Sequence, residues 1–356
     1  MSLKVDIKKR YKGFNLSVSF ETNKDYLGLL GASGSGKSVT LKCIAGIENP
    51  DDGIIELNGR VLYNSKKQMN LKPQERNIGY LFQNYALFPN MTVEENIGVG
   101  LKLPKKEKSI VVEEMIKKFH LHGLEKKYPT QISGGQQQRA ALARCIAYKP
   151  DVLLLDEPFS ALDAHLKSQV QAEIMELLRL YDGEVIMVTH SMEEAYKFCK
   201  NLVIIEDGNS LLFGETKDIF LNPRLVSAAR LTGCKNISSC SFIYPNKIHA
   251  HEWDVEIELN ESAANTDFIG IQSNNLEIVN CINSKEVNII ECEIIDIIEK
   301  IQGYTIIFKN KKSRSATSFM YFDVKKEKWN NRENKFNLFL KIHSDSVLLL
   351  KWWLKC

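Results

Sequence analysis

The stretch GASGSGKS, residues 31–38, decides the fold of this 356-residue chain. An apolar run at residues 27–30 precedes it and predicts a buried strand, and residues 38–44 begin a helical pattern. The loop between them matches G-x-x-x-x-G-K-[ST] at Gly31, Gly36, Lys37 and Ser38. The sequence therefore predicts a phosphate-binding loop in an α/β fold.

The small side chains of this loop suit an anionic ligand. Glycine lets backbone N–H groups approach phosphate oxygens without a Cβ in the way, and the following helix directs its positive end at the same anion. We expect Lys37 to reach the β- and γ-phosphates and Ser38 to bind Mg²⁺. A chance Gly/Ser loop is the alternative, which the strand–loop–helix context disfavours. The predicted ATP-binding residues here are Gly31, Ala32, Ser33, Gly34, Ser35, Gly36, Lys37 and Ser38.

A second apolar strand is predicted within DVLLLDEPFSALD, residues 151–163. It leads into Asp156 and Glu157, so both carboxylates lie at the end of the strand where ligands bind in open α/β sheets. Asp156 is expected to act as a second-sphere or water-mediated partner of Mg²⁺. Glu157 is expected to polarise a water for attack on the γ-phosphate.

A second candidate anion site lies in ISGGQQQR, residues 132–139. Ser133, Gly134 and Gly135 precede a predicted helix, whose N-terminus attracts anions. Taken alone, such a sequence is more often a plain N-cap. The first loop reverses that balance and favours a phosphate contact.

These motifs resemble those of ABC-transporter ATPases. GASGSGKS, the glutamine of YLFQNYALFP, ISGGQQQR, LLLDEPFSALD and VTHS follow one another in that family's order and rough spacing over residues 1–233. Ala32 stands where many members have proline, and Ile132 replaces the usual leucine. Neither departure removes a phosphate-contacting group.

The resemblance implies roles for residues that the bare patterns do not decide. It makes Gln83 a catalytic residue that senses Mg²⁺ or the attacking water and touches the membrane partner. It makes His190 a catalytic contact of the γ-phosphate, residues 160–163 the D-loop, and Tyr11 an aromatic that stacks on adenine. Ser133, Gly135 and Gln136 would bind the ATP of a second copy, because two domains of this family pair head to tail around two ATPs.

Composition excludes several classes of protein. A net charge of +3 does not favour nucleic-acid binding, and the eight cysteines lack the pairing of a structural metal site. No apolar run reaches the ~18–20 residues of a membrane span, and the N-terminus lacks a signal-peptide core. The chain is therefore expected in the cytosol, and the resemblance implies a peripheral place at the cytoplasmic face of the membrane. The resemblance implies separate permease subunits and a periplasmic or lipid-anchored substrate-binding protein as partners.

Residues 234–356 are expected to form a second domain. Runs rich in Ile, Val and Phe alternate with polar turns there and predict a small β-barrel. The resemblance to import ATPases implies a regulatory role for this domain. The segments LNGRVLYNSKKQMNLKPQERNIGYLFQNYALFPNMTVEENI, ARLTGCKNIS and FIGIQSNNLEIV resemble the ATPase subunit and oxyanion (TOBE-type) domain of molybdate importers. Sulfate/thiosulfate or another substrate remains the alternative.

Two other functions stay open at this point. A soluble ABC-type ATPase acting on DNA or ribosomes is disfavoured, because the chain shows one cassette and no heptad run. A regulator that binds nucleotide without hydrolysis is disfavoured by Glu157 and His190, which a pure binder does not need. The sequence thus predicts the ATP-hydrolysing subunit of an importer, most closely one for molybdate.

Overall fold

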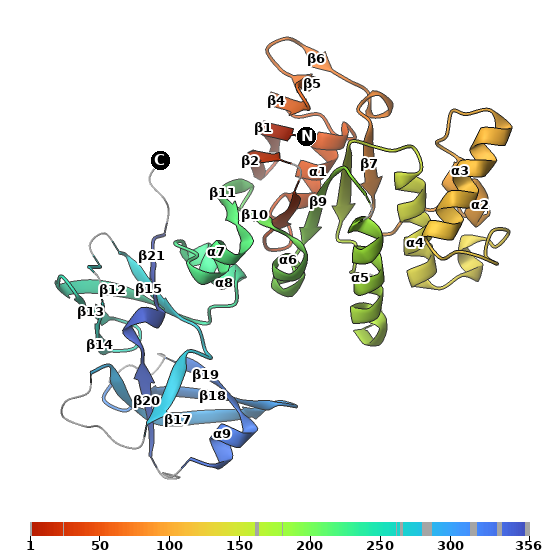
Figure 1. Ribbon diagram of the computed structural model, residues 1–356. Coiled ribbons are helices and arrows are strands. Elements are labelled where there is room, and N and C mark those ends of the chain that lie inside the picture. The colour runs from red at the N-terminus through yellow and green to blue at the C-terminus, as the bar shows by residue number, and fades with distance from the viewer. Residues whose placement is uncertain are drawn as a thin grey trace. The chain divides into compact units, whose positions relative to one another are not determined.

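The computed structural model describes residues 2–23, 25–160, 164–179, 181–260, 262–263, 266–279, 287–313, 319–332 and 337–352. The chain divides into two compact units, residues 1–217 and 218–356 (Figure 1). Each unit has its own sheets and its own apolar core. The described residues contain no helix long and apolar enough to cross a membrane.

The first unit is organised around an eleven-stranded mixed sheet in the order β6-β5-β4-β1-β2-β11-β10-β3-β9-β8-β7. Its strands are β1 (Ser2–Tyr11), β2 (Phe14–Asn23), β3 (Tyr26–Leu30), β4 (Asp52–Leu57), β5 (Arg60–Asn64), β6 (Met69–Asn70), β7 (Ile78–Leu81), β8 (Val152–Asp156), β9 (Glu184–Thr189), β10 (Asn201–Glu206) and β11 (Asn209–Glu215). Strands β10, β3, β9, β8 and β7 run parallel, and their residues are mostly buried. Full burial on both faces explains why these strands read as continuous apolar runs.

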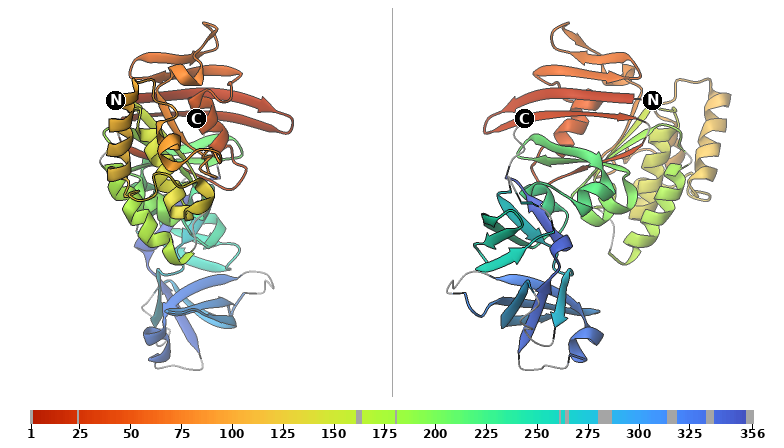
Figure 2. Two further views of the ribbon diagram at one scale, coloured as in Figure 1. Left: turned by 90° about the vertical axis from the view of Figure 1, so that its right-hand side faces the viewer. Right: turned by 60° about the vertical axis from the view of Figure 1, so that its left-hand side comes forward.

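Helices cover this sheet and extend beyond one edge. They are α1 (Lys37–Ala45), α2 (Val93–Gly98), α3 (Lys105–Lys118), α4 (Gly134–Ile146), α5 (Ala164–Arg179) and α6 (Met192–Phe198). Figures 1 and 2 show α2, α3 and α4 grouped beyond the β7 end of the sheet. The expected α/β fold and phosphate loop are therefore present, and α2 and α3 lie in residues 90–130, where the sequence predicts the short helices of a helical subdomain.

Two apolar clusters hold the first unit together. One joins α1 to the strands around β1, β3 and β8, with Leu41 and Ile44 fully buried. The other joins α2, α3, α4 and α5 to β7, β8 and β9, with Phe119 and Phe159 at most 1% exposed. Because α1 and α4 belong to different clusters, the helix after the phosphate loop and the helix after Ser133 are fixed to different parts of the unit.

The second unit is β-rich, as expected. It contains two five-stranded antiparallel sheets, β14-β13-β12-β15-β21 and β16-β20-β17-β18-β19, which share one apolar core. The strands are β12 (Asn236–Tyr244), β13 (Lys247–Ala250), β14 (Val255–Glu258), β15 (Phe268–Ile271), β16 (Leu276–Val279), β17 (Ile289–Glu299), β18 (Gly303–Asn310), β19 (Met320–Lys325), β20 (Leu338–Ile342) and β21 (Val347–Leu350), with helix α9 (Lys326–Asn330). The finer expectation of an oxyanion-type barrel stays a prediction.

The last residues of the expected first domain, from residue 218 on, belong to the second unit. Helix α7 (Thr216–Leu221) lies at the division, and α8 (Val226–Leu231) follows it. Val226 and Ala229 of α8 form a small apolar cluster with Cys234 and Leu350. The compact second unit thus begins before residue 234, and the functional boundary expected at residues 233 and 234 stays a prediction.

Glu184, the first residue of β9, predicts a pH-dependent stability. Its side chain is fully buried, and burial raises its pKa from 4.5 to about 7; the nearby Thr22 hydroxyl lowers this pKa in part, although it does not reach hydrogen-bond geometry. Since the folded state holds the proton more tightly, the contribution of this carboxyl to stability is fully present below about pH 4.5 and is lost as pH rises toward about 7. The full loss is roughly 3 kcal/mol.

Glu184→Gln should remove this dependence. At pH 8 the variant is expected to unfold at a higher urea concentration than the wild type, and at pH 5 the two should be similar, as measured by urea titrations. Glu21→Gln, at an exposed position, is the matched control. Equal pH profiles for the wild type and Glu184→Gln would contradict the prediction.

Candidate functional site

The phosphate loop leaves the sheet at Leu30 and enters α1 at Lys37, as the sequence predicts. Gly36 is the N-cap of α1 with φ 102°, a left-handed conformation that only glycine adopts without strain. At Gly31, a Cβ would lie 2.1 Å from the Ile205 backbone oxygen. The loop therefore requires glycine at both positions that define the motif.

Lys37 is almost completely buried and folds back over its own loop. Its Nζ donates to the Gly31 oxygen at 2.9 Å and the Ala32 oxygen at 2.7 Å, and it lies 3.5 Å from Ser35 Oγ. Burial lowers the pKa of the amine, while Glu157 and Asp156 raise it in part. A cation held by carbonyl oxygens in this way can exchange them for phosphate oxygens, which are the stronger acceptors.

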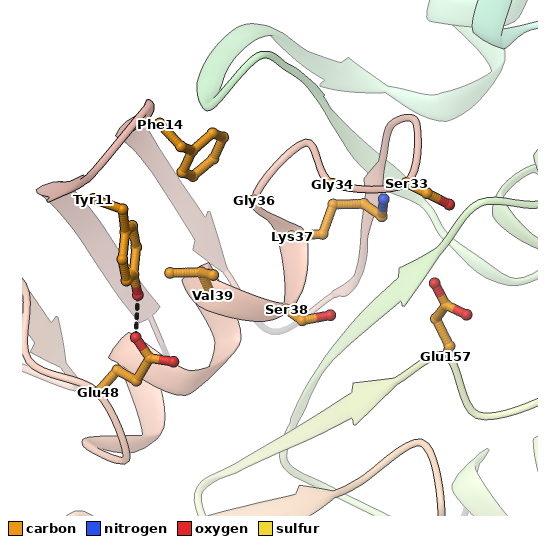
Figure 3. A pocket seen from close by; sticks show the side chains of 10 residues that line it. All are labelled: Tyr11, Phe14, Ser33, Gly34, Gly36, Lys37, Ser38, Val39, Glu48 and Glu157. Carbon is orange, nitrogen blue, oxygen red and sulfur yellow. Dashed lines mark hydrogen bonds between the residues drawn. The ribbon is translucent and has the colours of Figure 1, made fainter.

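A cavity of about 440 Å³ lies in front of this loop (Figure 3). Its lining includes the expected residues Tyr11, Ser33, Gly34, Gly36, Lys37, Ser38 and Glu157, together with Phe14, Val39 and Glu48. Tyr11 lies at one end beside Phe14, and its hydroxyl donates to Glu48. Ser38 and Glu157 point into the space at the other end (Figure 3). Tyr11, Phe14 and Glu48 thus lie toward one end of the pocket, and Ser38 and Glu157 lie toward the other.

The two carboxylates at the end of β8 face different partners. Asp156 accepts from Ser38 Oγ at 2.7 Å and from the Tyr80 hydroxyl at 2.9 Å. Glu157 follows the strand with φ 46°, and its backbone N–H donates to the Val188 oxygen. This left-handed backbone turns the Glu157 side chain away from Asp156 and toward the cavity.

Gln83 and His190 converge on Glu157. Gln83 Nε2 lies 3.2 Å from Glu157 Oε2, and His190 Nδ1 lies 3.4 Å from the same oxygen. The three residues follow three neighbouring strands, β7, β9 and β8, at their C-terminal ends. The residues expected to be catalytic are therefore brought together beside the loop.

The signature residues lie apart from this cavity. Ser133 caps α4 through a capping box, in which its Oγ accepts from the Gln136 N–H at 3.3 Å and its own N–H donates to Gln136 Oε1 at 2.9 Å. Ser133 is exposed, whereas Gly135 is half-buried, and a Cβ added there would be in van der Waals contact with Val170 at 3.5 Å. None of Ser133, Gly135 and Gln136 lines the cavity, and their contact with the ATP of a second copy stays a prediction. Of the expected D-loop, Ser160 donates to the Glu157 oxygen, and residues 161–163 lie outside the described residues.

Sequence reasoning missed three residues that support the site. The Tyr80 hydroxyl donates to one oxygen of Asp156. In the sequence, the only indication of this role is a polar hydroxyl on a residue of a buried strand. Arg76 is fully buried and donates to the Cys43 and Ile44 oxygens, so it satisfies the C-terminus of α1. Glu194 accepts from the Thr189 hydroxyl at 2.6 Å, next to His190. The contacts of Tyr80 and Arg76 join distant parts of the chain, which a local pattern does not reveal, whereas the Glu194 contact spans only five residues.

Comparisons with known proteins agree with this geometry. Residues 14–160 match the family model described as ABC transporter. The chain is 40% identical over 245 residues to "Probable sulfate/thiosulfate import ATP-binding protein CysA" of Chlorella vulgaris, covering 66% of this chain and 100% of that protein. It is 40% identical to "Molybdate/tungstate import ATP-binding protein WtpC" of Pyrococcus horikoshii, covering 66% of this chain and 68% of the relative.

A third relative is "Spermidine/putrescine import ATP-binding protein PotA" of Oleidesulfovibrio alaskensis, at 41% identity over 60% of this chain. That match spans 57% of the length of the PotA protein. Among solved structures, a dimeric post-hydrolysis state of an ATP-binding cassette bound to ADP and Pi is similar, with a TM-score of 0.51, 25% identity, and coverage of 61% of this chain and 99% of that one. The chain belongs to the ABC transporter family, among its ATP-binding cassette ATPases.

Proposed function

We propose that this chain binds and hydrolyses ATP as the nucleotide-binding subunit of an importer. The observation that carries the proposal is the meeting of Gln83, Glu157 and His190 beside the glycine loop, within 3.4 Å of one carboxylate oxygen. A protein that only binds nucleotide needs the loop but not this cluster. Basal ATPase activity of the purified chain, measured as phosphate release, tests the proposal directly.

ATP would lie along the cavity with its triphosphate on the loop. Backbone N–H groups of residues 31–38 would bind the phosphates, and Lys37 would exchange the Gly31 and Ala32 oxygens for β- and γ-phosphate oxygens. Tyr11, at the other end, would stack on adenine. The Glu48 contact of its hydroxyl fixes the ring at this end.

The donor set near Ser38 fits Mg²⁺. A hydroxyl and a carboxylate lie 2.7 Å apart there, and hard cations prefer such oxygen ligands. Ser38 and Gln83 would hold the ion, with Asp156 as its second-sphere or water-mediated partner. When bound, Mg²⁺ neutralises charge on the phosphate oxygens.

Glu157 would take the proton of the attacking water, because its carboxylate faces the cavity and lies next to the γ-phosphate end of the loop. Gln83 would orient that water, and His190 would contact the γ-phosphate. A second copy would supply Ser133, Gly135 and Gln136 to complete each site. This arrangement makes closure of the pair dependent on ATP.

The chain would act at the cytoplasmic face of the membrane with separate permease subunits and a periplasmic or lipid-anchored binding protein. We keep molybdate as the proposed cargo, because residues 57–97, 229–238 and 268–279 resemble the corresponding segments of molybdate importers. The CysA and PotA relatives, at 40% and 41% identity, favour sulfate/thiosulfate and polyamines as alternatives. The second unit would then carry regulation by the cargo.

The cargo is tested in the assembled transporter. ATPase activity and uptake should rise with molybdate or tungstate bound to the substrate-binding protein. If only sulfate or only spermidine stimulates the transporter, that compound is the cargo and molybdate is not. The proposal that the chain hydrolyses ATP would still stand. The readout is uptake into proteoliposomes with each compound at matched concentration.

Tyr80→Phe predicts a change in the requirement for Mg²⁺. The substitution removes only the hydroxyl that binds Asp156, and hydrogen bonds to charged groups contribute about 1.5 kcal/mol or more. We expect the Mg²⁺ concentration for half-maximal ATPase activity to rise roughly tenfold, since 1.4 kcal/mol is tenfold in an equilibrium. Tyr63→Phe, which loses a bond to the Pro50 oxygen, is the matched control. An unchanged Mg²⁺ requirement in Tyr80→Phe would contradict the role of Asp156.

A further inference from the structure

The segment that follows Gln83 has an unusual backbone. Residues 82–92 connect β7 to α2, and within them Tyr85 and Ala86 have consecutive positive φ angles of 61° and 46°. Neither is glycine, and each left-handed residue costs roughly 1–2 kcal/mol. Such strain persists only where the surroundings hold the backbone in place.

Arg144, in the last turn of α4, holds this backbone. Its Nη2 donates to the Tyr85 oxygen at 2.9 Å, and its Nη1 donates to the Ala86 oxygen at 2.7 Å. The guanidinium carbon also lies 5.6 Å from the centre of the Phe88 ring. The planar fork of arginine can bind two successive carbonyl groups, whereas lysine offers a single point donor.

Two more contacts fasten the same segment to the helices. The Tyr85 ring is buried in the apolar cluster of α2, α3 and α4. The fully buried Asn96 of α2 donates to the Phe88, Met91 and Thr92 oxygens and accepts from the Phe88 N–H at 2.8 Å. The segment after Gln83 is therefore attached to the helical subdomain, while Gln83 itself follows strand β7 and contacts Glu157.

We infer that Arg144 is a positioning residue that couples the Ser133 end of α4 to Gln83. Ser133 and Arg144 are eleven residues apart on one helix, a rise of about 16 Å. A displacement of α4, caused by nucleotide at its N-terminus, is carried through the Arg144 fork to the Tyr85 and Ala86 backbone. It thereby moves Gln83 relative to Glu157. This inference rests on the proposed roles of Gln83 and Ser133.

A double-mutant cycle on the full chain tests the coupling. Arg144→Lys keeps the charge and loses the fork, so kcat should fall roughly ten- to hundredfold, the scale of a misplaced reacting group. The KM for ATP should change by less than about twofold, because Arg144 is not among the residues that line the cavity. In a Gln83→Ala background, Arg144→Lys should have almost no further effect on kcat, because the residue through which it acts is gone.

Arg60→Lys is the control. Arg60 is exposed in β5 and makes no described contact with residues 82–92, so its substitution should leave kcat within about twofold. Equal fold-losses for Arg144→Lys in the wild-type and Gln83→Ala backgrounds would overturn the inference and leave the proposed function intact. Absence of ATPase activity in the wild type would instead contradict the proposed function.

A measurement on the wild-type chain covers the case in which Arg144→Lys does not fold. Hydrogen exchange under increasing urea should show peptides of residues 84–91 opening together with α4. Opening together with β7, at a urea concentration where α4 is still protected, would overturn the inference.

Discussion

Glu157→Gln is expected to lower the turnover of ATP by roughly 10²- to 10⁴-fold, the usual contribution of a general base. Glutamine keeps the shape of the side chain and its contacts with Gln83 and His190, but it does not accept a proton at neutral pH. The backbone of residue 157 stays held by the Val188 oxygen and by the Ser160 N–H, so the turn is preserved. Phosphate release under saturating ATP measures the loss.

ATP affinity should survive the same substitution. The loop, Lys37 and Tyr11 are untouched, so the Kd of a fluorescent ATP analogue should stay within about threefold of the wild-type value. Glu48→Gln is the matched control, since Glu48 lines the same cavity at the Tyr11 end and should leave kcat nearly unchanged. Wild-type turnover in Glu157→Gln would remove Glu157 from the proposed mechanism.

The parts of this site that the sequence predicted are those that depend only on residues adjacent in the sequence. Gly31 is needed because a Cβ there would clash with the Ile205 oxygen, and Gly36 is needed because its backbone is left-handed. The apolar run before Asp156 forms a strand and so places the Asp156 carboxylate at the end of that strand. Both requirements are local, so a short motif records them.

The parts that were missed depend on contacts across the fold. Arg76 reaches the end of α1 from a position more than thirty residues away, and Arg144 reaches residues 85 and 86 from almost sixty away. A buried arginine looks like any surface arginine in a sequence, because its partners are backbone oxygens, which every residue has. The same holds in the second unit, where the single segment FIGIQSNNLEIV, residues 268–279, forms two strands, β15 and β16, that belong to different sheets.

Gly31→Ala is expected to destabilise the first unit by about 3 kcal/mol or more, at the upper end of the range for overpacking. The added methyl group would lie 2.1 Å from the Ile205 oxygen and 2.6 Å from Ser35 Oγ. Ile205 belongs to β10, which is paired on both sides in the middle of the sheet, so its carbonyl has little freedom to move. The loop must shift instead, and with it the Gly31 oxygen that holds Lys37.

Gly34→Ala in the same loop separates crowding from backbone strain. Gly34 has φ 81° but no atom within 4 Å of an added Cβ, so alanine there should cost only about 1 kcal/mol, through its left-handed backbone. Urea titrations of both variants give the two free energies of unfolding, and nucleotide titrations show whether Gly31→Ala also loses ATP binding. Equal free energies of unfolding for the two alanine variants would mean that the Ile205 carbonyl of β10 moves to make room for the methyl group of Gly31→Ala. In that case the close approach of loop and strand would not be what fixes Lys37 in the site.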